Sequence, residues 1–178
     1  MRFLAMTIAG AALMLATGPA DAQLATGTRA PDFKTMGAIG GTEFRLHLAE
    51  QLEKGPVVLY FFPKAFTSGC TLESKAFADA MPQFRKAGAT VIGLSGDDVD
   101  TLARFSTEVC RSKVPMAHAS AELMEAYDAK LPAVGVAMRT SYVIDTDGTI
   151  SLVHSDMDYK DHVATTLRAV KKLAGAGG

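Results

Sequence analysis

The feature that most constrains the fold is an uninterrupted apolar run, VVLYFF, at residues 57–62. Gly55-Pro56 precede this run and Pro63 follows it, and these boundaries are typical of a short strand. Successive side chains of a strand point to opposite sides of the sheet, so a strand that is apolar at every position is buried on both faces. The chain therefore needs a sheet that other elements cover on both sides.

Strand-like and helix-like segments alternate along the rest of the chain. Gly40-Gly41 and Asp147-Gly148 each predict a hairpin turn between apolar segments. Further strands are expected at 90–94, 114–119, 141–144 and 149–154, and helices at 46–52, 70–86, 99–111, 121–126 and 161–174. This alternation, with a final antiparallel hairpin, predicts an α/β fold in which helices flank a mixed β-sheet.

Two details of the helices follow from single residues. Pro82 should kink or split the helix at 70–86, because proline removes a backbone hydrogen bond. Asp97 and Asp98 stand directly before the helix at 99–111, where either carboxylate can cap the first turn.

Length, charge and cysteine count exclude several functions. The chain has 178 residues, which suits one globular domain. With 18 Lys and Arg against 19 Asp and Glu, it lacks the basic excess that nucleic-acid binding needs. Two cysteines are too few for a Cys₄ zinc site or a disulfide-stapled mini-protein. The cysteines are therefore free for chemistry.

The N-terminus resembles an export signal. Arg2 is followed by an apolar stretch at 3–16, and Ala20-Asp21-Ala22 has the small-x-small pattern of a cleavage site. The alternative is a membrane anchor, but the apolar stretch is shorter than the roughly 20 residues of a spanning helix. We expect a signal peptide at 1–22 and one domain at 23–178, exported to the periplasm and not membrane-bound after cleavage.

The residues that carry chemistry follow the apolar strand. After Pro63 comes a short loop, and Cys70 begins the next predicted helix. A thiol at a helix N-terminus faces unpaired N–H groups and the positive end of the helix dipole, which both favour the nucleophilic thiolate. Lys64 could add positive potential, and Thr67 could point its hydroxyl at the sulfur or at an oxygen bound beside it. The alternative is an inert cysteine that fills the core.

This segment resembles the active site of the peroxiredoxins. The pattern Pro63-x-x-x-Thr67-x-x-Cys70 is similar to their motif, and FFPKAFTSGCTLE is most similar to the Q-type, or bacterioferritin-comigratory, branch. The resemblance extends over APDF at 30–33, VIGLS at 91–95, and Arg139 before SYVID at 141–145. It implies a thioredoxin-like fold and a thiol-dependent peroxidase that reduces hydrogen peroxide and organic hydroperoxides without a cofactor or metal.

The resemblance also implies a role for each residue of the motif. Cys70 attacks the hydroperoxide and becomes a sulfenic acid. Thr67, Arg139 and backbone N–H groups stabilise the stretched O–O bond, and the charge of Arg139 favours the thiolate. Pro63 shapes the loop and shields the sulfur from water. A surface salt bridge is the alternative explanation for Arg139.

The family pattern is broken at the resolving cysteine. Many Q-type members carry it five residues after the first, where this chain has Lys75. Cys110, near the end of the predicted helix at 99–111, is the remaining candidate. The alternatives are a structural Cys110 and a one-cysteine mechanism with an external thiol. The resemblance implies a thioredoxin-like or other dithiol protein as reductant, and leaves a monomer or a homodimer open.

Other classes of protein fit less well. A thiol–disulfide oxidoreductase needs a C-x-x-C pair, but Thr67 occupies the first position. An exported redox sensor or binding module would need neither Thr67 nor Arg139 beside a thiol. A copper carrier of this fold would need a cysteine at Ser74. The acidic and histidine residues before the last helix could bind a metal, but helix capping is the preferred explanation; they are His154, Asp156, Asp158, Asp161 and His162.

Overall fold

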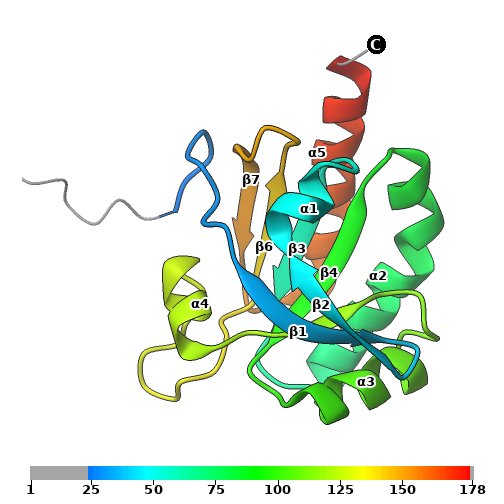
Figure 1. The fold of residues 1–178 in the computed structure, drawn as a ribbon, viewed down its shortest axis with the longest axis vertical. Coiled ribbons are helices and arrows are strands. Elements are labelled where there is room, and N and C mark those ends of the chain that lie inside the picture. The colour runs from blue at the N-terminus through cyan, green and yellow to red at the C-terminus, as the bar shows by residue number, and fades with distance from the viewer. Residues whose placement is uncertain (1–23, 177–178) are drawn as a thin grey trace, which may run out of the picture.

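The computed structural model describes residues 24–176, so the predicted signal peptide at 1–22 lies outside the described residues. A seven-stranded sheet forms the centre, in the order β2-β1-β5-β4-β3-β6-β7 (Figure 1). The strands are β1 (Lys34–Ile39), β2 (Thr42–His47), β3 (Val57–Phe61), β4 (Thr90–Ser95), β5 (Met116–His118), β6 (Thr140–Ile144) and β7 (Ile150–Ser155). The helices are α1 (Leu48–Leu52), α2 (Ser68–Lys86), α3 (Val99–Glu108), α4 (Ala121–Ala126) and α5 (His162–Ala176), with a 3₁₀ turn, η1 (Tyr159–Asp161), before α5.

The apolar run forms β3 and lies inside the sheet, as its composition predicts. It pairs in parallel with β4 and antiparallel with β6, so the sheet is mixed. Val58, Tyr60 and Phe62 enter one core cluster, while Val57, Leu59 and Phe61 enter the other. Every side chain of β3 is buried, because helices cover both faces of the sheet.

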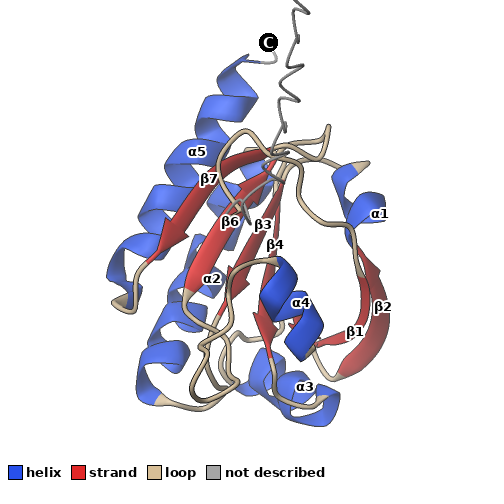
Figure 2. Ribbon diagram, turned by 90° about the vertical axis from the view of Figure 1, so that its left-hand side faces the viewer, coloured by secondary structure: helices blue, strands red, loops and turns tan. Residues whose placement is uncertain are grey.

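The two faces carry different helices. Figure 2 shows α2 and α5 on one side of the sheet and α1 and α4 on the other. Residues of α2, α3 and α5 share the core cluster that contains both cysteines. The reactive-thiol candidate therefore lies on the α2–α3–α5 side. No helix in the described range 24–176 is long and apolar enough to cross a membrane.

Two predictions about the helices, the break at Pro82 and the end of the helix at 99–111, are wrong. Pro82 does not split α2, which runs unbroken from Ser68 to Lys86; a proline near the end of a helix removes one internal hydrogen bond, while Met81 and Phe84 beside it are buried in the core. Helix α3 ends at Glu108 rather than at Arg111, because Arg111 and Ser112 have left-handed backbone conformations.

The two predicted capping aspartates have different functions. Asp98 is the N-cap of α3, and its carboxylate accepts a hydrogen bond from the N–H of Thr101 at 2.7 Å. Asp97 does not cap. Its carboxylate instead accepts hydrogen bonds from the N–H of Ala65 at 2.7 Å and the hydroxyl of Ser95 at 2.6 Å. Asp97 thereby fastens the loop between β3 and α2 to the end of β4.

Candidate active site

The loop from β3 to α2 is held in place at several points. The N–H of Phe62 donates to the carbonyl of Leu94 at 2.9 Å, and the N–H of Ala65 donates to Asp97. Phe66 has a left-handed backbone (φ 62°), and its ring meets Phe105 of α3 edge-on, with centroids 5.1 Å apart. These contacts fix where α2 begins, and they place Cys70 at a defined point beyond the C-terminal end of β3.

Cys70 is the third residue of α2 and is 2% exposed. The N-cap, Thr67, makes no side-chain hydrogen bond to the first turn, so the first backbone N–H groups of α2 stay available to an oxygen at this end of the helix. The Thr67 hydroxyl donates to the carbonyl of Lys64 at 2.9 Å, which leaves its oxygen as an acceptor. Half-buried Pro63 begins the loop.

Arg139 lies against the cysteine. Its Nη2 is 3.5 Å from the sulfur of Cys70, and its Nε donates to the carbonyl of Met157 at 3.1 Å. Its Nη1 forms an ion pair with Glu73. The Arg139 side chain is 4% exposed, so the alternative of a surface salt bridge is wrong. The structure thus brings together the thiol and the guanidinium that the sequence resemblance implied.

Glu73 is a site residue that the sequence analysis missed. It lies three positions after Cys70, on the same side of α2, and is completely buried. Burial raises the pKa of its carboxyl to about 8, and the opposing charge of Arg139 limits the rise. The available signal was an acidic residue on the apolar side of the predicted helix, because a carboxylate there needs a buried cation.

His162, at the start of α5, lies behind Glu73 rather than in a metal site. The imidazole is buried; Nδ1 is 2.8 Å from the hydroxyl of Ser141, and Nε2 is 2.9 Å from the carbonyl of Asp156. Burial lowers the pKa of this ring to about 4. Asp158 caps the 3₁₀ turn η1, which leads into α5, through the N–H of Lys160, and not α5 itself. Within residues 24–176, no three His, Cys, Asp or Glu side chains group to hold a metal ion.

Cys110 lies two residues beyond the end of α3 and is fully buried. Its sulfur faces the carbonyl of Ser74 at 3.9 Å, one helical turn after Cys70. Burial raises the pKa of the Cys110 thiol to about 12. Both cysteines are free thiols in this structure. Cys110 is therefore on the correct side of α2 for a reaction with Cys70, but it is held as an un-ionised thiol.

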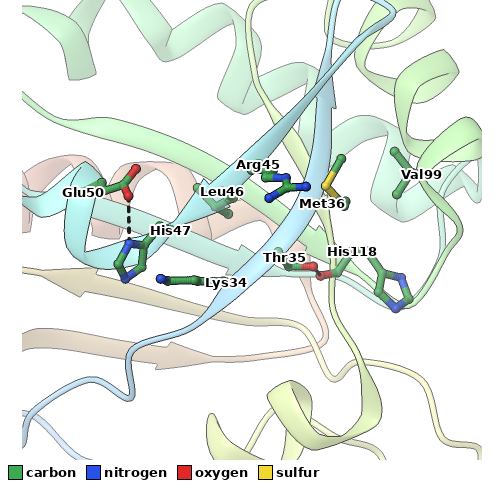
Figure 3. Close-up of a pocket in the computed structure, with 9 residues that line it drawn as sticks. All are labelled: Lys34, Thr35, Met36, Arg45, Leu46, His47, Glu50, Val99 and His118. Carbon is green, nitrogen blue, oxygen red and sulfur yellow. Dashed lines mark hydrogen bonds and ion pairs between the residues drawn. The ribbon is translucent and has the colours of Figure 1, made fainter.

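A separate hollow of about 700 Å³ lies beside the β1–β2 hairpin (Figure 3). Its lining includes Lys34, Met36, Arg45, His47 and His118, and it contains none of the predicted site residues. Hydrogen bonds that the ring donates to the carboxylates of Asp32 and Glu50 raise the pKa of His47. This hollow is distinct from the thiol site.

The fold and the buried thiol–guanidinium pair suit chemistry at a cysteine. Comparison with known families gives the class of the protein: the profile of the AhpC/TSA family matches residues 26–153. The chain therefore belongs to the AhpC/TSA family of peroxiredoxins and is a thiol-dependent peroxidase.

Individual relatives agree with this assignment. A chloroplastic peroxiredoxin Q of Oryza sativa subsp. japonica is 30% identical over 156 residues, covering 85% of this chain and 69% of the relative. The crystal structure of peroxidoxin BcpB from Mycobacterium tuberculosis superposes with a TM-score of 0.75 at 31% identity, covering 83% of this chain and 97% of that one. Mycobacterium tuberculosis AhpC, at 24% identity and a TM-score of 0.76, covers 86% and 94% respectively and shares the fold. The predicted thioredoxin-like fold is confirmed.

Proposed function

We propose that Cys70 is the peroxidatic cysteine and that it reduces hydrogen peroxide and organic hydroperoxides. The observation that carries this proposal is the 3.5 Å contact between the Cys70 sulfur and the buried Nη2 of Arg139. A guanidinium held there by Glu73 and by the Met157 carbonyl favours the thiolate without having to reorganise during the reaction.

The first step is a displacement at oxygen. The Cys70 thiolate attacks the terminal oxygen of the hydroperoxide, forming an S–O bond while the O–O bond breaks. The leaving alkoxide or hydroxide departs with the electron pair and takes a proton from water, and the sulfenic acid keeps the hydrogen of the attacked oxygen. Arg139 and the free N–H groups of the first turn stabilise the developing charge, and the hydroxyl oxygen of Thr67 accepts a hydrogen bond from the O–H of the hydroperoxide, which stays on the attacked oxygen. Pro63 limits the access of water to the sulfur.

The second step forms a disulfide between Cys70 and Cys110. The Cys110 thiol attacks the sulfenic sulfur, and water leaves with the sulfenic oxygen. Cys110 is buried and faces Ser74, so the first turns of α2 must open before the two sulfurs can bond. A thioredoxin-like or other dithiol protein then reduces the disulfide. In the alternative one-cysteine mechanism, an external thiol attacks Cys70 and Cys110 is structural.

We infer the setting of the reaction from the N-terminal sequence. A signal peptide at 1–22 would deliver the domain to the periplasm, where disulfides form and persist. The enzyme would act there as a monomer or homodimer, and its reductant would have to reach the same compartment.

Peptide mapping after one equivalent of hydrogen peroxide tests these assignments. We expect wild-type protein to contain a Cys70–Cys110 disulfide, and a Cys110→Ser variant to carry one added oxygen on Cys70. Oxidation that falls on methionine or on Cys110 while Cys70 stays reduced would overturn the proposal. A single oxygen on Cys70 of the wild type, with Cys110 unmodified, would support the one-cysteine mechanism instead.

A further inference from the structure

The turn of α2 that follows Cys70 is joined to β3 by a buried hydrogen bond between two side chains. The hydroxyl of Tyr60 donates to Oγ of Ser74 at 3.1 Å, and both residues are completely buried. The Tyr60 ring also stacks on Phe77 of α2, with centroids 4.2 Å apart. Ser74 stands one helical turn after Cys70, yet the proposed peroxide step uses neither Tyr60 nor Ser74.

The fold makes room for this hydroxyl at Gly93, which pairs with Tyr60 across β3 and β4. A Cβ at Gly93 would lie 2.7 Å from the Tyr60 hydroxyl oxygen and 2.5 Å from Sδ of Met116. Glycine weakens the interior of a strand, and here it permits that close approach. The Met116 sulfur, at 3.7 Å, is a second acceptor for the hydroxyl, but a thioether accepts weakly. Ser74 is therefore the strong partner of a donor that is shielded from water.

The Ser74 turn also occupies the place where the two cysteines have to meet. The sulfur of Cys110 faces the carbonyl of Ser74 at 3.9 Å. A disulfide needs its sulfurs about 2 Å apart, so Cys70 has to reach the position beside Cys110 that this turn fills. The segment of Cys110 is itself held, because the N–H of Ser112 donates to the carbonyl of Ser106 at 2.9 Å. The Ser74 turn is therefore the part that moves when the disulfide forms.

Movement of this turn takes the Ser74 hydroxyl away from Tyr60. A buried donor that loses its acceptor without reaching water raises the free energy of the open form. We propose that Tyr60 is a positioning residue that holds the Ser74 turn closed and thereby sets how fast the sulfenic acid of Cys70 becomes a disulfide. This inference rests on the proposed roles of Cys70 and Cys110.

Two reactions compete for the sulfenic acid. In resolution, the S–S bond forms, the S–O bond breaks, and the proton of Cys110 leaves with the sulfenic hydroxyl as water. In over-oxidation, the sulfur of the sulfenate attacks a second hydrogen peroxide; a second S–O bond forms, the O–O bond breaks, and the leaving hydroxide takes the proton of the transferred oxygen to become water. The closed turn keeps Cys70 beside Arg139 and favours over-oxidation, while the open turn favours the disulfide.

The test is the rate of disulfide formation after reduced protein is mixed with hydrogen peroxide, measured by rapid quench and mass spectrometry. Wild type is compared with Tyr60→Phe and with Tyr142→Phe, the matched control, whose buried hydroxyl donates to the carbonyl of Tyr127 in the core on the other face of the sheet. We expect Tyr60→Phe to form the Cys70–Cys110 disulfide about fivefold faster, which is the effect of one net buried hydrogen bond on an equilibrium. The peroxide concentration that converts half of the protein to sulfinic acid should rise by the same factor. The first oxidation of Cys70 should keep its rate in all three proteins.

A disulfide rate in Tyr60→Phe equal to or below that of wild type would overturn the inference, as would the same acceleration in Tyr142→Phe. If circular dichroism shows that Tyr60→Phe does not fold, Ser74→Ala serves instead. It removes the acceptor and should accelerate the disulfide about twofold, less than Tyr60→Phe because alanine is a better helix former; an unchanged rate would contradict the proposal. A wild type that oxidises Cys70 but forms no disulfide would overturn the resolving step and this inference together. Failure of the proposed function itself looks different, because Cys70 would then stay reduced.

Discussion

The guanidinium of Arg139 lies 3.5 Å from the sulfur of Cys70, although 69 positions of sequence separate the two residues. Antiparallel pairing of β3 with β6 produces this contact, because Phe61 at the end of β3 faces Thr140 at the start of β6. The loop that leads to Cys70 begins at this end of β3, and Arg139 stands directly before β6 at the same end of the sheet. The register of two central strands therefore builds the site.

Replacing Arg139 should separate its effect on the rate of Cys70 oxidation from its effect on stability. Arg139→Ala should slow Cys70 oxidation by about 100-fold, since it removes a preorganised donor, and should lower the free energy of unfolding by about 3 kcal/mol, since it leaves Glu73 buried without its cation. The double variant Arg139→Ala with Glu73→Gln should recover stability but not rate. Rapid-quench kinetics and urea unfolding measure the two quantities. A double variant as fast as wild type would show that Arg139 matters to folding alone.

The anchor of the active-site loop can be tested at Asp97. Asp97→Ala should slow peroxide oxidation of Cys70 several-fold, because the N–H of Ala65 loses its acceptor and the loop can shift. Asp98→Ala is the matched control; it removes the N-cap of α3 and should cost about 1 kcal/mol of stability with little change in rate. Stopped-flow rates and thermal melting compare the pair. Equal rate losses in both variants would mean that Asp97 has no specific effect on the loop.

Cys110→Ser tests the resolving step. The variant should consume the first equivalent of peroxide and then stall as a sulfenic acid, which further peroxide converts to sulfinic acid. Turnover with a dithiol reductant should fall, while the first oxidation keeps its rate, because Cys70 and Arg139 are untouched. Mass spectrometry and steady-state assays measure these effects. Unimpaired cycling of Cys110→Ser on the same dithiol reductant would exclude the two-cysteine mechanism.

Stability should depend on pH through His162. Burial lowers the pKa of this ring to about 4 in the folded protein, while the unfolded chain titrates near 6.5. The unfolded state therefore binds the proton first, and stability falls as pH decreases from 6.5 to 4, by at most on the order of 3 kcal/mol. Urea unfolding of His162→Gln should show a smaller decrease over this window. An identical pH dependence in both proteins would mean that the pKa of His162 is the same in the folded and unfolded states.

Much of the fold could be predicted because local patterns determine it. The apolar run of β3, the two glycine turns and the Asp98 cap each have a local cause, and each is present in the structure. One helix end could not be predicted, because its cause is a backbone conformation and not a pattern of apolar residues. The end of α3 depends on left-handed Arg111 and Ser112, which the apolar periodicity of a helix does not indicate.

The site residues also differ in whether their position has a local cause. Cys70 and its helix N-terminus are local features, so they could be predicted. The ion pair of Glu73 and the burial of His162 depend on how α2, β6 and α5 pack together, and the sequence by itself placed His162 among solvent-facing acids. Resemblance to a family indicated Arg139, and the register of β3 with β6 then explained its position.

The most direct test of the central claim is the consumption of peroxide by Cys70→Ser in a single turnover without added reductant. Serine keeps the size and the hydrogen bonding of the side chain but cannot form a thiolate, so the variant should fold as wild type does and consume no hydrogen peroxide. Cys110→Ser, measured beside it, should consume one equivalent. If folded Cys70→Ser consumed a full equivalent at the wild-type rate, Cys70 would not be the nucleophile and the account would be wrong.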